Sequence, residues 1–227
     1  MPPSPERSLQ MQERGLAWRS DLTHQHECRD GGREVVFRSI GGSSDEAWAA
    51  GNLLPDGTFA FAVRVACAQR STGGLCCIGV CDADSLVAWG VHLGSGRLFR
   101  CQRVAATGRV VNGGPPFSPG FPDGHGTRVV DEAAIVAALD SSAGSVQVVC
   151  VVDSATQTLS IGLHGDEPRV ALRNLPHGVS LRPWARLAHS HERATLEAHD
   201  PLVLGRGTNK WVTACVARRG GHRTQVV

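Results

Sequence analysis

The sequence predicts an all-β protein, a two-sheet antiparallel β-sandwich that contains only short helices. From Trp18 onward, short Val-rich runs alternate with Gly-rich turns, which is the pattern of many strands joined by tight connections. The strands do not alternate with helices, as they would around a parallel sheet. The 227 residues, of which 41% are apolar and 19% charged, suffice for one large globular domain with a real core.

Ten runs are expected to form strands. The run 58–68 alternates most clearly and places two phenylalanines and two valines on one face: Phe59, Phe61, Val63 and Val65. The run 145–152 is apolar on both faces, so it should lie in the centre of a sheet. The other strands are expected at 33–40, 75–80, 87–93, 97–104, 158–163, 169–172, 181–187 and 194–198, with a further one at 210–217.

Two stretches favour helix, and one long segment favours neither state. Residues 131–140 carry acids in the first turn of an Ala-rich run, and 6–15 could form a short helix. The Gly/Pro-rich segment 112–126 is expected to be an irregular loop. We expect a flexible leader over 1–17, the sandwich over 18–200 and a basic tail over 201–227.

Charge and cysteine content indicate a chain of the cytoplasm. The net charge is only +2, from 23 basic and 21 acidic residues, so no basic field indicates nucleic-acid binding. No apolar run is long enough to cross a membrane, and the polar N-terminus does not resemble a signal peptide. The eight cysteines are therefore expected to be reduced and to act as small hydrophobic residues.

The sequence contains no motif typical of catalysis or metal binding. It lacks G-x-S-x-G, H-E-x-x-H, a P-loop and G-x-G-x-x-G. A strand would place His24, His26 and Cys28 on one face, but no second pair of ligands has zinc-site spacing. We therefore expect no metal, no cofactor and no enzymatic activity, although a catalytic triad need not be visible in a sequence.

Four blocks, in this order, resemble a SPRY (B30.2-like) domain. They are TFAFAVRV at 58–65, IGVCDADSLVAWGVHLGSGRLF at 78–99, SVQVVCVVDSATQTLSIGLHGDE at 145–167 and RVALRNLPHGVSLRPWARL at 169–187. Phe61 stands where the family usually has a tryptophan, and the 131–140 stretch is extra. Within the third block, Asp153 is expected to open a hairpin turn, and both His164 and Gly165 suit a positive φ.

The resemblance implies a non-catalytic sandwich that recognises a partner protein or peptide through loops at one end. Such domains often serve as the substrate-reading modules of ubiquitin ligases, so an adaptor role is expected. No RING-type cysteine–histidine array precedes the blocks, which suggests a nearly bare module that acts as a monomer. A carbohydrate-binding, lectin-like sandwich and an enzyme on a sandwich scaffold are the alternatives.

Four loops are candidates for the binding surface: 41–52, 69–74, the loop around Phe117 and Phe121, and 188–192. The candidate binding residues are Trp48, Arg70, Ser71, Thr72, Phe117, His189 and Ser190, because loop aromatics and arginines are common interface anchors. Trp48 could instead fold onto the sandwich.

Two further tryptophans bear on the core. Trp89 is expected to be buried. Strict alternation would make Arg182, Trp184 and Arg186 an outward-facing stripe, whereas a bulge after Pro183 would bury Trp184; burial is favoured.

Overall fold

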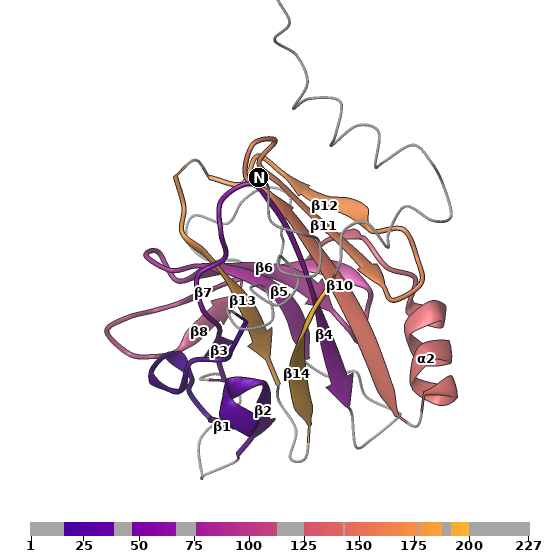
Figure 1. The fold of residues 1–227 in the computed structure, drawn as a ribbon, viewed down its shortest axis with the longest axis horizontal. Coiled ribbons are helices and arrows are strands. Elements are labelled where there is room, and N and C mark those ends of the chain that lie inside the picture. Colours follow the sequence, from indigo (N-terminus) through magenta and orange to yellow (C-terminus); the bar gives the residue numbers. More distant parts are fainter. Residues whose placement is uncertain are drawn as a thin grey trace, which may run out of the picture.

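The computed structural model describes residues 16–38, 47–66, 76–112, 125–142, 144–176, 178–187 and 192–199. Strands account for 54% of them and form two antiparallel sheets, which confirms the predicted fold class. Figure 1 shows the sheets as two layers, with the helix α2 beside β10. No helix in this part of the chain is long and apolar enough to cross a membrane.

The first sheet has seven strands in the order β1-β2-β14-β4-β10-β11-β12. Their bounds are β1 His26–Arg29, β2 Glu34–Phe37, β14 Arg193–Ala198, β4 Thr58–Ala66, β10 Ser145–Asp153, β11 Thr158–Leu163 and β12 Arg169–Arg173. The doubly apolar strand β10 lies between β4 and β11, as its sequence predicts.

The second sheet runs β3-β13-β5-β6-β7-β8, and β9 also pairs with β7. The bounds are β3 Ala49–Ala50, β13 Leu181–Arg186, β5 Cys77–Asp82, β6 Val87–His92, β7 Arg97–Arg103, β8 Val110–Asn112 and β9 His125–Arg128. The register joins Gly79 directly to Gly90. A Cβ on Gly90 would collide with the backbone carbonyl of Ile78, so the close approach of β5 and β6 requires glycine.

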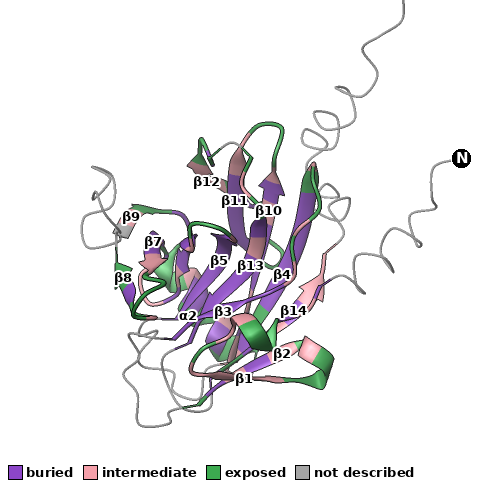
Figure 2. Ribbon diagram, turned by 90° about the vertical axis from the view of Figure 1, so that its left-hand side faces the viewer, coloured by how far each residue is buried: buried purple, intermediate pink, exposed green. Residues whose placement is uncertain are grey.

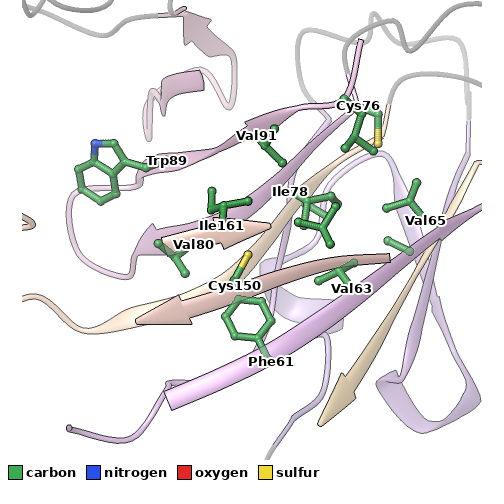
Figure 3. Close-up of a cluster of buried hydrophobic side chains, with 14 of the residues drawn as sticks. Phe61, Val63, Val65, Cys76, Ile78, Val80, Trp89, Val91, Cys150 and Ile161 are labelled. Atoms are coloured by element: carbon green, nitrogen blue, oxygen red, sulfur yellow. The ribbon is translucent and has the colours of Figure 1, made fainter. Parts of the chain in front are cut away.

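The main core fills the space between the sheets (Figure 3). The predicted face of β4 is fully inside, with Phe61, Val63 and Val65 at 0% exposure. Ile78 from β5 in the opposite sheet and Ile161 from β11 in the same sheet belong to the same buried cluster. Figure 2 shows the burial along the strands, while exposed residues gather in the turns. The alternation of side chains across each strand therefore accounts for the core.

One α-helix and two short 3-10 helices, η1 (Ser20–Leu22) and η2 (Asp30–Gly32), lie in the described chain. The helix α2 spans Glu132–Ser141 and confirms the prediction to within one residue. The carboxylate of Asp131 accepts a hydrogen bond from the Ala133 N–H at 3.1 Å and caps the helix. Its buried residues Ile135 and Leu139 join the main core.

The prediction was wrong at three points. It missed the short strands β1, β3, β8 and β9, and its irregular loop over 112–126 overlaps the end of β8 and the start of β9. Tertiary pairing with β7 holds these two strands, and local sequence does not encode that pairing. His164 does not adopt a positive φ, whereas Gly165 does at 91°. Asp153 opens its turn as predicted and accepts hydrogen bonds from the N–H groups of Ala155 and Thr156.

Candidate functional site

Segments from three of the four candidate loops begin and end at the same end of the sandwich. At this end β4 finishes opposite the start of β14, because Ala66 pairs with Arg193. In the other sheet the end of β13 pairs with the start of β5, through Arg186 and Cys77. We call this the loop end; the segments 39–46, 67–75 and 188–191 all connect there. The fourth segment, 113–124, joins β8 and β9, which both pair with β7 in the second sheet.

Of the candidate binding residues, the described part of the chain contains Trp48 alone. The other six, Arg70, Ser71, Thr72, Phe117, His189 and Ser190, lie outside the described residues. Trp48 is only 1% exposed, so its indole is not an exposed loop anchor. Its backbone pairs with that of His24, and this pairing holds the side chain against the second sheet. The alternative of a tryptophan folded onto the sandwich is therefore correct.

Trp48 packs on Trp184, with ring centroids 5.4 Å apart and planes tilted by 56°. Trp184 has 0% exposure, so the favoured burial is confirmed, but the proposed bulge is wrong. The pairing of β13 with β5 is regular from Leu181 to Arg186, and Trp184 faces away from the main core as alternation predicts. The two tryptophans belong to a second apolar cluster on the outer face of this sheet, with these further members: Ala50, Cys77, Cys81, Ala88, Phe99, Cys101 and Val110.

His26, which the sequence analysis considered only as part of a possible zinc cluster, connects the two sheets at the loop end. His26 Nδ1 donates to the carbonyl oxygen of His24, and Nε2 accepts from the Leu187 N–H at 3.2 Å. The ring also meets Phe37 edge-on, with centroids 5.6 Å apart. Burial lowers the pKa of His26 to about 4, so the ring is neutral at physiological pH. Leu187 directly precedes the 188–191 segment, so this contact fixes one base of that loop.

A shallow groove lies beside His26 along the edge strand β1. It is lined by Ser20, Gln25, His26, Glu27, Cys28 and Arg38. Glu27 accepts ion-pair contacts from Arg29 at 2.9 Å and Arg38 at 2.8 Å, and these arginines lower the pKa of its carboxyl. Gln25 has a φ of 57°, which interrupts the extended backbone between His24 and His26. The three residues His24, His26 and Cys28 therefore do not form the single strand face that zinc binding would require.

The described cysteines are free thiols within apolar surroundings. Six of the eight fall in the described chain, and only Cys28 among these six is partly exposed. Burial raises the pKa of Cys101 to about 12 and that of Cys150 to about 12, and it also raises the pKa of Cys77 and Cys81. No group of three or more His, Cys, Asp or Glu side chains in the described chain is placed to hold a metal ion.

A row of side chains that includes three arginines crosses the second sheet at the loop end. Register places Arg186, Cys77, His92, Arg97 and Arg128 next to one another on five neighbouring strands. Arg186 is buried at 2% exposure and donates to Asn112 Oδ1 at 3.2 Å. Arg97 and Arg128 are exposed. The loop end therefore combines the attachment points of three loops with an exposed pair of arginines.

Comparison with solved structures places this fold among known domains. The SPRY domain of human HERC1 superposes with a TM-score of 0.51 at 15% identity, covering 81% of this chain and 98% of that domain. The TRIM65 PSpry domain gives 0.46 at 14% identity over 88% of this chain and 99% of that one. The Drosophila melanogaster neuralized NHR1 domain gives 0.49 at 12% identity over 82% and 98%.

Sequence comparison adds no closer relationship. No protein-family model matches the chain, and no curated protein matches it. The four sequence blocks that resemble SPRY domains supply strands to both sheets. The chain therefore has the fold of a SPRY domain.

Proposed function

We propose that this chain is a non-catalytic protein-interaction module of the cytoplasm that binds a partner protein or peptide through the loop end. The observation that supports it is the convergence of three loop bases on one end of a rigid two-sheet core. Loops held by a rigid scaffold can vary without cost to the core, which is why binding residues concentrate there. In this proposal the loop residues Arg70, Thr72 and His189 contact the partner, and Trp48 supports the surface from below.

The anchoring of the loops supports a preformed surface. His26 accepts from Leu187 at the start of 188–191, and the Glu192 carbonyl accepts from the Phe37 N–H at 3.1 Å at its end. A loop whose two bases are fixed loses less conformational entropy on binding than a free one. The two fixed bases of 188–191 therefore favour binding of the partner at the loop end.

Affinity capture from the native lysate tests the proposal with loop variants of matched size. One variant combines Arg70→Ala with Thr72→Ala, and a second combines His189→Ala with Ser190→Ala. Asp84→Ala serves as the control, since this exposed residue lies in the β5–β6 turn at the opposite end. We expect each loop variant to weaken capture of the partner by at least about tenfold, because interface arginines and polar contacts at a site centre each contribute 1–2 kcal/mol or more.

The outcomes separate the functions that the sequence left open. Equal capture by both loop variants and by Asp84→Ala would overturn the loop-end proposal. Glycan-array binding that is lost in the same loop variants would favour the lectin alternative instead. As a finer proposal, the module presents its partner to a ubiquitin ligase. Ligase subunits should then be recovered together with the partner, and accumulation of that partner after loss of the chain would support the adaptor role.

A further inference from the structure

We propose that the partner presents an acidic segment, and that Arg97 and Arg128 on the second sheet bind it. The inference rests on the proposed function and adds the chemistry of the partner. Its first support is the register of β7 and β9, which sets Arg97 directly opposite Arg128. Two like charges in that position repel each other, and such cross-strand pairs destabilise a sheet.

Among the described residues, one acid forms an ion pair with Arg128 and none does so with Arg97. Glu132 forms an ion pair with Arg128: its carboxylate lies 3.7 Å from the Arg128 guanidinium, with both side chains more than half exposed. The Asp131 carboxylate is engaged in capping the helix α2. Among the described residues, no carboxylate lies within ion-pair distance of Arg97. An exposed arginine opposite another arginine is therefore best satisfied by an anion from outside the chain.

The sequence around the pair extends the same charge. From Ser85 to Pro122 there is no Asp or Glu, although this segment contains four arginines: Arg97, Arg100, Arg103 and Arg109. Three of these arginines, Arg97, Arg100 and Arg103, lie on β7, so this strand carries local positive charge in a chain whose net charge is only +2. Figure 2 shows β7, β8 and β9 together at one side of the molecule. A local basic surface on a near-neutral protein steers and selects acidic partners.

The position of the pair relates this charge to the proposed site. Arg97 and Arg128 lie in register with Arg186, the last residue of β13, which precedes the 188–191 segment. A segment that crosses the loop end can therefore continue onto this row of the second sheet. Guanidinium groups hold carboxylates through two parallel hydrogen bonds, so two adjacent arginines fit a pair of Glu or Asp residues.

Charge reversal at the pair makes a test that separates binding from stability. Arg97→Glu places a carboxylate opposite Arg128 and converts a repulsive pair into an attractive one. This variant should therefore melt at the same temperature as the wild type or higher, while losing affinity for acidic segments. The double variant R97E/R128E reverses both charges. The matched control R169E/R173E reverses two exposed arginines on β12 of the first sheet.

The measurement is the affinity of the full chain for four probes. Fluorescence anisotropy measures a labelled glutamate-rich peptide, a labelled glutamine-rich peptide of equal length and labelled single-stranded DNA. Co-sedimentation measures phosphatidylserine vesicles. We expect the glutamate peptide to bind the wild type. R97E/R128E should weaken this binding at least about tenfold, because the loss of each of the two charge-assisted contacts should weaken it at least about threefold. The control R169E/R173E should change the affinity less than about twofold. Arg97→Glu alone should lower the affinity for the glutamate peptide without lowering the melting temperature of the protein.

Three results would overturn the inference: absence of binding to the glutamate peptide, equal weakening by both double variants, or tighter Arg97-dependent binding of DNA or vesicles. The last would make this a surface for another polyanion. Failure here is distinguishable from failure of the proposed function. If the loop variants lose the captured partner while R97E/R128E retains it, the loop end binds and only the acidic-segment inference falls.

Discussion

Replacement of His26 should remove a specific part of the pH dependence of folding. The ring is held neutral because Nε2 accepts from Leu187 and Nδ1 donates to His24, so protonation of Nε2 would set two donors against each other. The charged groups beside it in the groove are Glu27 and Arg38. The pKa of Glu27 is lowered by its arginine partners, so this carboxylate stays ionised as the histidine titrates.

The magnitude follows from the two pKa values of the histidine. Burial lowers the pKa of His26 from 6.5 to about 4 in the folded chain, whereas the unfolded chain keeps the ordinary value. Below pH 6.5 the unfolded chain therefore binds the proton first, and stability falls as the pH falls toward 4. Between pH 8 and pH 5 this one group should remove about 2 kcal/mol of the free energy of unfolding.

Urea denaturation at a series of pH values measures this, for the wild type and for His26→Gln. The wild type should be the more stable at pH 8, because glutamine cannot reproduce both ring contacts. The difference between the two proteins should shrink by about 2 kcal/mol as the pH falls to 5, since only the wild type carries this linkage. Other histidines contribute equally to both curves and cancel. If the free energies of unfolding of the two proteins change in parallel over the whole pH range, the buried, neutral state that we assign to His26 is refuted.

Three further outcomes are expected. Trp48→Ala should lower the free energy of unfolding by about 3–5 kcal/mol in urea denaturation, because the side chain is 1% exposed and packed on another tryptophan; a change below about 1 kcal/mol would contradict its burial. Gly90→Ala should cost more than about 2 kcal/mol, since the new methyl group meets the Ile78 carbonyl, and a neutral effect in the same assay would contradict the close strand approach. In native alkylation with peptide mapping, Cys28 should react before Cys150, because burial raises the pKa of the Cys150 thiol to about 12; equal rates would show that the core opens.

The sandwich could be predicted because its evidence is local. Alternation in β4 and the doubly apolar run in β10 both follow from side-chain periodicity, which a sequence displays directly. The strands β8 and β9 were missed because both are short and flank the Gly/Pro-rich segment, where local sequence does not encode their pairing with β7. A three-residue strand next to glycines becomes regular only through its partner.

The candidate site was less predictable, because outward facing and exposure are different properties. Alternation correctly turned Trp184 away from the main core, yet a second apolar cluster buries it on the outer face. Trp48 is buried there by backbone pairing with His24, a contact between distant residues. His26 was noticed only as part of a possible zinc cluster, because no sequence motif marks a neutral histidine that links two sheets by hydrogen bonds. The sequence does contain one indication of the arginine pair. No acidic residue lies between Asp84 and Asp123, the segment that contains Arg97.

Hydrogen–deuterium exchange of the chain with and without its captured partner tests the central claim most directly. The account predicts protection at the loop end, over 67–75 and 188–191 and at the adjoining backbone of Arg97. Exchange should stay unchanged in the opposite turns 83–86 and 154–157, which belong to the same sheets and serve as internal references. Protection confined to those opposite turns, with the loop end unaffected, would contradict the proposal that the loop end binds the partner.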